Sequence, residues 1–298
     1  MKAADLGKAT IWCTPSVSVY VQSHLSIPLS EPLTNFPADT RTLIAIGGGY
    51  LLDESKAWIQ DKAPNVRLVA IPSLWGSGAE ASPIIVQNRN GAKVIRMDAK
   101  FLPFARVIWP ELARTIPEAR AKEALGDCWA NALEGFLSPL ADDRLRGDIA
   151  LLMQAMRRLP LGNHPDWFEL SAQASAAQAQ SSVGLVHGIA HTLEGPLIAA
   201  QPDQGWGHAK LCAVYLWPVT RFNFQHNNAN RELLQKYGLD PDALLKIARD
   251  LYSDGAYRKA LPLLQSLWTA VLRDRCTRTN SVLVRAPHLD YFTTEAFV

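Results

Sequence analysis

The chain has 298 residues, of which 48% are hydrophobic and 19% charged, and 30 basic against 28 acidic side chains leave a formal charge of +2. This length accommodates one large domain or two modest ones, and the composition excludes a disordered chain. The near balance of charge argues against a nucleic-acid-binding protein, and no basic run is long enough to hold an anionic membrane surface.

The cysteines and the N-terminal segment indicate the compartment. Cys13, Cys128, Cys212 and Cys276 lie too far apart for a zinc knuckle or a redox pair. Residues 1–22 mix charged residues with apolar ones, so we expect no signal peptide. No stretch reaches the roughly 20 apolar residues of a membrane span. We therefore expect a soluble, cytoplasmic protein.

The segment before residue 110 is typical of an α/β domain. Short apolar, β-branched runs between turn residues predict strands at Ala9–Cys13, Val17–Val21, Thr42–Ile46, Arg67–Ile71, Pro83–Val86, Lys93–Met97 and Arg106–Trp109. A helix is predicted after Gly49, through Lys56 and Trp58. Residues 22–41, which contain several prolines, predict an irregular connection.

From Ile116 onward the hydrophobic period becomes helical. Helices are predicted at Pro117–Leu137, Arg144–Leu159, Glu169–Glu194, Ala209–Phe224, Pro241–Ser253 and Ala260–Arg273. No strand of comparable strength follows Trp109. We therefore expect an α/β domain over residues 1–110 and an all-helical domain over residues 111–298.

Two glycine-rich loops follow two successive predicted strands. The first is Gly47-Gly48-Gly49 and the second is the segment 72–80, which contains Gly76 and Gly78. One such loop is as often a tight structural turn as a ligand site. Two of them at the carboxyl ends of neighbouring strands favour a nucleotide or phosphate site, because helix N-termini and sheet edges bind anions there.

Three residues of the helical half form a candidate metal site. His187 and His191 share one face of an otherwise apolar helix, His208 lies between glycine and a helix start, and Asp127 is a carboxylate in an apolar helix. Taken singly, each histidine is as well explained by a buried structural role, and Asp127 by an exposed or salt-bridged position on its helix. Together Asp127, His187 and His208 would leave one coordination position open, as in catalytic zinc sites. Imidazole also suits iron, so the residues do not decide the metal.

Six segments, in order between residues 42 and 225, carry a resemblance to a known family. They are Gly47–Lys56, Ile71–Glu80, Gly91–Lys93 with Pro103 and Pro110, Gly126–Glu134, Gly184–His191, and Gly207-His208 with Leu216–Pro218 and Phe222-Asn223. These segments resemble the motifs of the iron-containing (group III), metal-dependent alcohol dehydrogenases. That superfamily also includes glycerol dehydrogenase and, more distantly, dehydroquinate synthase.

The resemblance implies a Rossmann-like α/β domain and a helical domain, with the metal site in the cleft between them. It implies a divalent metal, zinc or iron, held by Asp127, His187 and His208, with His191 as the catalytic residue beside the nicotinamide or substrate. The implied NAD(P) site consists of Gly47, Gly48, Gly49, Asp53, Ser73, Ser77 and Lys93. A small-molecule substrate and a homodimer are also implied.

Several departures from the family pattern qualify these expectations. Asn131 stands where iron-dependent members have a histidine ligand, which predicts a three-ligand site like that of the zinc-using glycerol dehydrogenases. Tyr50 and Trp75 replace small residues, and the bulk of Trp75 is expected to fill space that the cofactor uses. Fewer residues precede Gly47 than in the family, which predicts a shortened nucleotide-binding domain.

Three hypotheses about function follow. The first is a metal-dependent, NAD(P)H-linked alcohol dehydrogenase or aldehyde reductase. The second is a non-redox metalloenzyme, such as a lyase, hydrolase or isomerase, whose nicotinamide site is reduced or lost. The third is a non-catalytic relative, against which the retention of Asp127, His187 and His208 argues. The substrate is not readable from the sequence.

Overall fold

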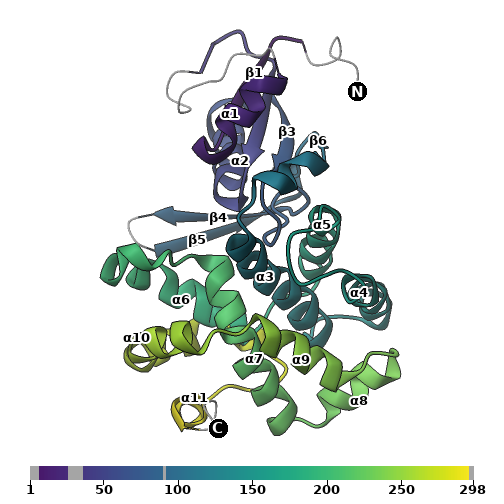
Figure 1. Cartoon of the computed structure of the whole chain (residues 1–298), viewed down its shortest axis with the longest axis vertical. Helices are drawn as coiled ribbons and strands as arrows, with labels where there is room; N and C mark the ends of the chain where they lie inside the picture. The colour runs from purple at the N-terminus through teal and green to yellow at the C-terminus, as the bar shows by residue number, and fades with distance from the viewer. Residues whose placement is uncertain (1–6, 26–35, 90–91, 295–298) are drawn as a thin grey trace. The chain divides into compact units, whose positions relative to one another are not determined.

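The computed structural model describes residues 7–25, 36–89 and 92–294, and Figure 1 labels their helices and strands. Contacts between Cα atoms group the chain into two compact units, Met1–Glu118 with Asn163–Ala176, and Ala119–Gly162 with Ala177–Val298. The first is an α/β unit. Within the described residues, every regular element of the second unit is a helix. The expected fold class is therefore confirmed, whereas the domain boundary at residue 110 stays a prediction.

A four-stranded parallel sheet organises the first unit. Its strands are β1 (Ala9–Cys13), β2 (Thr42–Gly47), β3 (Arg67–Pro72) and β6 (Ala105–Arg106), in the order β1-β2-β3-β6. All six residues of β2 are buried, as expected for a central parallel strand covered on both faces. The strands β4 (Ile84–Arg89) and β5 (Ala92–Met97) form a separate antiparallel pair.

The predicted strand Val17–Val21 is wrong, because these residues lie in helix α1 (Pro15–His24). The short run of β-branched valines predicts a strand, but the burial pattern is helical. In the structure Val17 and Val21 are buried while Val19 is 79% exposed, which is the four-residue spacing of a helix face. Pro15 occupies the first turn, where its missing N–H costs nothing. Of the predicted irregular segment 22–41, residues 26–35 lie outside the described residues.

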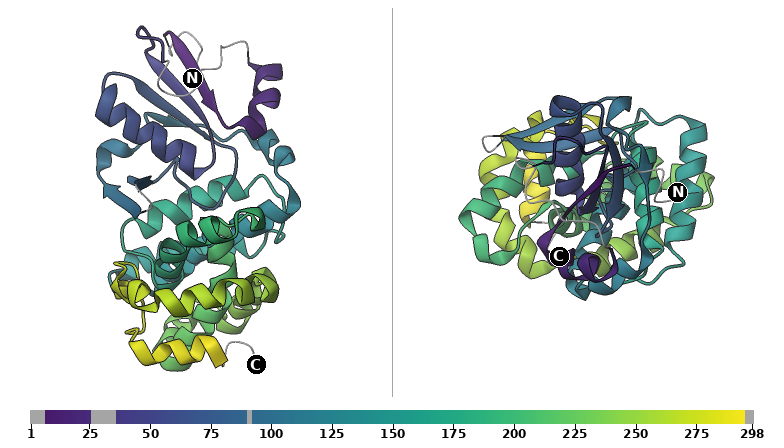
Figure 2. Two further views of the ribbon diagram at one scale, coloured as in Figure 1. Left: turned by 90° about the vertical axis from the view of Figure 1, so that its left-hand side faces the viewer. Right: turned by 90° about the horizontal axis from the view of Figure 1, so that it is seen from above.

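Helix α2 (Gly49–Lys62) packs on strands β2 and β3 and begins at the last glycine of the first glycine loop (Figure 2). Leu51, Leu52 and Ile59 of the helix share a buried apolar cluster with Leu43 and Leu68 of the sheet. This packing places the start of the helix at the carboxyl end of β2.

A buried lysine joins α2 to the end of the second glycine loop and to the chain that follows it. The Lys56 ammonium donates hydrogen bonds to the carbonyls of Ala79, Ser82 and Ile84 at 2.8, 3.1 and 2.7 Å. It also lies 3.1 Å from Asp53, whose carboxylate accepts a hydrogen bond from the backbone of β4. Burial lowers the pKa of Lys56 and raises that of Asp53, and each charge opposes the effect on the other.

Helix α5 (Trp167–Gln178) lies mostly in the first unit. The other helices belong wholly or largely to the second unit: α3 (Glu118–Leu137), α4 (Asp143–Met156), α6 (Leu185–Ala200), α7 (His208–His226), α8 (Ala229–Lys236), α9 (Pro241–Leu251), α10 (Asp254–Arg273) and α11 (Leu289–Thr294). Short 3₁₀ turns lie at Ala99–Phe101, Pro110–Thr115, Pro202–Gln204, Thr277–Thr279 and Ala286–His288. No helix of the described ranges is long and apolar enough to cross a membrane.

Two further sequence predictions need correction. The single helix Glu169–Glu194 is in fact two, because α5 ends at Gln178 and α6 begins only at Leu185. The intervening serines bond to local and distant backbone instead, as Ser181 does to the carbonyl of Gly135. The strand Arg106–Trp109 shrinks to Ala105–Arg106, since the chain turns into a 3₁₀ helix at Pro110.

Replacement of Lys56 tests whether this buried cation holds α2 in place. Lys56→Met would leave a buried carboxylate and three carbonyls without their partner, so we expect a loss of about 3–5 kcal/mol in unfolding free energy. Urea denaturation measures it. Lys62→Met, at an exposed position of the same helix, serves as the control and should change stability little. Equal effects of the two variants would contradict the assigned role.

Candidate metal centre

The two glycine loops of the first unit lie side by side, as the sequence predicted. Gly47 pairs with Pro72 at the ends of β2 and β3, and the amide of Ser73 donates to the carbonyl of Gly47 at 2.9 Å. A Cβ on Gly49 would lie 2.5 Å from the Ser77 hydroxyl oxygen. The helix start and the second loop therefore touch, and only glycine fits between them.

The second loop is shaped by packing against α5. Gly78 has a φ of +56°, and a Cβ there would lie 2.4 Å from the side chain of Ser175. The amide of Gly76 donates to the Ser171 hydroxyl at 2.7 Å. Trp75 is 2% exposed and its ring packs edge-on against Phe168, with centroids 5.3 Å apart. The bulk of Trp75 therefore packs in the core of the first unit, and its effect on the cofactor space stays a prediction.

The other residues predicted for the dinucleotide site are placed as follows. Ser73 is buried directly after β3, and Ser77 lies in the second loop, where its hydroxyl is 3.4 Å from the amide of Ala79. Asp53 is engaged with Lys56 and β4, so its carboxylate has a structural partner. Lys93 lies in β5, outside the four-stranded sheet. Contact of any of these residues with a cofactor stays a prediction.

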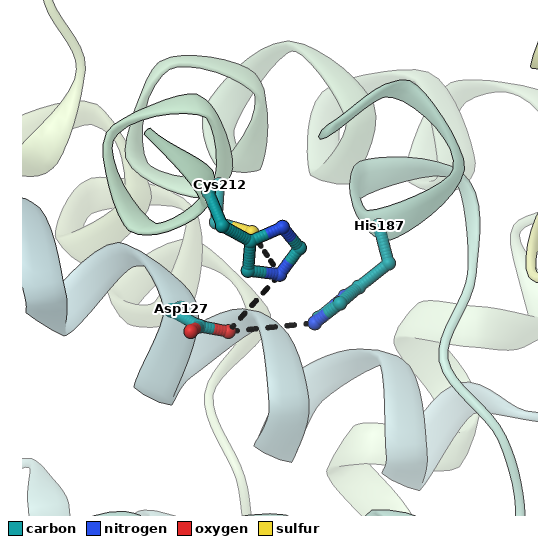
Figure 3. A group of neighbouring side chains, drawn as sticks. Asp127, His187 and Cys212 are labelled. Atoms are coloured by element: carbon teal, nitrogen blue, oxygen red, sulfur yellow. Dashed lines mark hydrogen bonds and ion pairs between the residues drawn. The ribbon is translucent and has the colours of Figure 1, made fainter. Parts of the chain in front are cut away.

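Asp127, His187 and His208 come together although they lie on three different helices, α3, α6 and α7. The Asp127 Oδ1 atom is 3.4 Å from His187 Nε2 and 3.8 Å from His208 Nε2 (Figure 3). Cys212, one turn after His208 on α7, lies with its Sγ 3.7 Å from the same His208 nitrogen. The four donor atoms lie within 4.8 Å of one another, and all four residues belong to the second unit.

Glu134, on α3, orients His187. One carboxylate oxygen lies 2.7 Å from His187 Nδ1, and the other accepts a 2.6 Å hydrogen bond from the amide of Val186. The bond to Glu134 keeps a proton on Nδ1, so Nε2, which faces Asp127, is the nitrogen that would bind a metal in place of its own proton. Burial acts to lower the pKa of His187, but hydrogen bonds and charges from Asp127 and Glu134 outweigh it and raise this pKa to about 9.

The same carboxylate caps the start of α6. Gly184 precedes the helix and has no side chain to cap it. Glu134 and Asn280, from distant parts of the chain, accept the amides of Val186 and Leu185. A Cβ on Gly184 would lie 2.8 Å from Asn280 Oδ1 and 2.9 Å from Glu134 Oε1. The first turn of α6 is therefore held by tertiary contacts, and His187 lies within it.

Close contact between α3 and α7 brings Asp127 to the site. A Cβ on Gly126 would lie 2.3 Å from the backbone of Ala213, which is closer than any real contact. Gly126 precedes Asp127, and Ala213 follows Cys212. The absence of a side chain at Gly126 therefore lets the two donor residues approach.

A second group of polar side chains adjoins the first. The His191 and His208 rings stack with centroids 5.3 Å apart. His191 Nδ1 lies 3.5 Å from an Asp274 oxygen and 3.8 Å from Cys276 Sγ. Burial raises the pKa of the Cys276 thiol, so this sulfur is protonated in the absence of a metal.

Sequence reasoning missed Glu134, Cys212, Asp274 and Cys276. Two of these carried a readable signal: Glu134 follows Asp127 by seven residues on one helix face, and Cys212 follows His208 by four. Asp274 and Cys276 lie far from the other site residues in sequence. Only the fold brings them to His191.

Gly126→Ala tests the contact between α3 and α7. We expect overpacking to lower the free energy of unfolding by about 1–3 kcal/mol and to weaken metal binding, because Asp127 moves with the helix. Urea denaturation and chelator competition measure the two effects. Gly147→Ala is the control, since a Cβ there meets nothing within 4 Å. An alanine tolerated equally at both positions would contradict the contact.

Glu134→Gln tests the orientation of His187. A glutamine places an NH₂ group against either His187 Nδ1–H or the Val186 amide, so one pair of donors must face each other. We expect metal affinity to fall about 10–100-fold, measured by competition with a chromophoric chelator. Glu123→Gln removes the same charge from the same helix and should leave the affinity unchanged. Unaltered affinity in the Glu134 variant would refute this role.

No family model matches the chain. Among curated proteins, it is 23% identical over 274 residues to the probable alcohol dehydrogenase EutG of Salmonella typhimurium, covering 80% of this chain and 68% of that protein. It is 27% identical over 226 residues to 1-propanol dehydrogenase PduQ of the same organism, covering 70% of this chain and 56% of PduQ. The chain thus spans between about half and two thirds of these relatives.

Solved structures share the fold at lower identity. The iron-containing alcohol dehydrogenase of Thermococcus thioreducens superposes with a TM-score of 0.70 at 17% identity, over 97% of this chain and 92% of that one. Sulfoacetaldehyde reductase of Bifidobacterium kashiwanohense, solved in complex with NAD⁺, superposes with a TM-score of 0.70 at 16% identity, over 99% and 91%. The sequence relatives are thus named as alcohol dehydrogenases, and the structures that share the fold include iron-containing alcohol dehydrogenases, in line with the resemblance carried by the ordered motifs.

Proposed function

We propose that the protein is a metal-dependent alcohol dehydrogenase or aldehyde reductase that acts on a small substrate with a nicotinamide cofactor. The observation that carries this proposal is the convergence of Asp127, His187 and His208 in a chain whose homologues are alcohol dehydrogenase-type oxidoreductases. A cytoplasmic location and a homodimer accompany the proposal as predictions.

The donor set fits a divalent metal. Two imidazole nitrogens and a carboxylate oxygen face one another at 3.4 and 3.8 Å, which is too long for good hydrogen bonds between them. Nitrogen and oxygen donors of this kind bind zinc or iron. When bound, the metal would supply a Lewis acid beside the substrate's hydroxyl or carbonyl group, and the nicotinamide would supply or accept the hydride.

The remaining side chains divide the other tasks. Glu134 keeps a proton on Nδ1 of His187, so that Nε2 is the nitrogen that would bind the metal. Asp274 lies 3.5 Å from His191 and stabilises a proton on that ring, so His191 would hold the proton exchanged with the substrate. The paired glycine loops of the first unit offer backbone amides for the cofactor's phosphates.

The proposal is tested on metal-loaded protein with NADH or NADPH and a panel of small aldehydes, following the loss of dihydronicotinamide absorbance. We expect turnover that chelation abolishes and added zinc or iron restores. His208→Ala should lose both stoichiometric metal and at least about 99% of turnover. His226→Ala, at an exposed position at the other end of α7, is the matched control and should keep both.

The possible failures have different meanings. Metal content and turnover that survive His208→Ala would refute the assigned ligands. Bound metal without cofactor binding or dihydronicotinamide oxidation would refute the redox reaction and favour a non-redox metalloenzyme on the same fold.

A further inference from the structure

We propose that the thiolate of Cys212 is a fourth protein ligand to the metal, giving a donor set of one carboxylate, two imidazoles and one thiolate that favours zinc. The inference rests on the metal site of the proposed function and concerns its fourth coordination position. Cys212 follows His208 by four residues, so both side chains leave α7 on the same face one turn apart.

The distances are close to the edges of a coordination tetrahedron. Zinc bonds of about 2.0–2.1 Å to nitrogen or oxygen and about 2.3 Å to sulfur imply edges of about 3.3–3.6 Å between neighbouring donors. The Asp127–His187 distance of 3.4 Å lies within this range, and the Asp127–His208 and His208–Cys212 distances of 3.8 and 3.7 Å lie slightly above it, so a small inward shift of the side chains would close the site around an ion. The Asp127 carboxylate and the Cys212 thiol are thus both neighbours of the same His208 nitrogen.

Asn131 does not occupy this fourth position. Its amide nitrogen donates a hydrogen bond to Asp127 Oδ1 at 3.1 Å, so the side chain holds the carboxylate through its NH₂ group. Turning the amide over would set its oxygen against the carboxylate oxygen. Asn131 therefore positions a ligand, and Cys212 supplies the remaining donor.

Charge and burial favour a second anionic ligand. Asp127 is 3% exposed and Cys212 fully buried, and a divalent cation in such surroundings needs compensating charge. A Cys212 thiolate would add its charge to those of Asp127 and of Glu134, which lies one step away behind His187. The metal itself drives the loss of the thiol proton, because coordinating thiols are deprotonated. A soft thiolate in a tetrahedral site selects zinc over iron.

Cobalt substitution provides the direct test. Wild-type protein, stripped by chelation and loaded with Co²⁺, should show an intense near-ultraviolet band of thiolate-to-cobalt charge transfer. Cys212→Ser should lose the band while retaining cobalt through the other three ligands, with affinity more than about tenfold weaker. Cys276→Ser is the matched control, since Cys276 is the sulfur of the neighbouring His191 group, and it should keep the band.

X-ray absorption at the zinc edge of the wild type and of Cys276→Ser makes the test independent of how Cys212→Ser folds. One sulfur at about 2.3 Å in both proteins is expected. In competition between Zn²⁺ and Fe²⁺, the ratio of zinc to iron bound should fall at least about tenfold in Cys212→Ser.

Each result decides between the proposals. Bound metal with no sulfur neighbour in the wild type overturns the role of Cys212 and leaves the three-ligand site intact. A band that disappears in Cys276→Ser and persists in Cys212→Ser also overturns it. Failure of the wild type to bind any metal overturns both this inference and the proposed function.

Discussion

The carboxylate of Glu134 is the contact on which the site depends. With one oxygen it accepts the Val186 amide at the uncapped start of α6, and with the other it holds the Nδ1 proton of His187. A single buried charge therefore sets where α6 begins and in which direction one donor nitrogen points. Since α6 also carries His191, the same contact positions the residue proposed to hold the substrate's proton.

Helix α7 is positioned at the site by a close backbone contact with α3, whereas α6 is positioned by hydrogen bonds. Gly126 lets α3 approach Ala213 to a distance that no side chain would permit. The neighbouring residues, Asp127 and Cys212, are thereby brought to the same point. The donor atoms then face one another at distances suited to a metal rather than to mutual hydrogen bonds. The centre is a product of helix packing, and each helix contributes no more than two of its donors.

In the first unit, a buried charge and close glycine contacts hold two loops and a helix together. Lys56 ends the first motif of the family resemblance, and its ammonium binds α2 to three carbonyls, that of Ala79 in the second loop and those of Ser82 and Ile84 after it. Gly78 and Gly49 likewise have packing neighbours that require glycine. Glycines in such a motif can therefore be required by the packing of the two loops as well as by a bound ligand.

Local periodicity and motif order were enough to predict the parallel strands, most helices and the trio Asp127, His187 and His208, because these depend on short-range spacing. Where propensity and packing disagree, local patterns mislead: the valines of α1 suggest a strand but form a helix, and the continuous helical pattern over α5 and α6 hides a break. The contact of Trp75 with Phe168 in the core is likewise not readable from the loop sequence.

The sequence by itself determined the family resemblance, the types of side chain that could bind a metal, and the positions of the glycine loops. Only the tertiary structure decided how that chemistry is assembled. The distance from Glu134 to His187, the nearness of Cys212 to Asp127, and the pairing of His191 with Asp274 join residues that are remote in sequence or lie on different helices. Such contacts are set by helix packing and by the capping of α6, which no local pattern encodes.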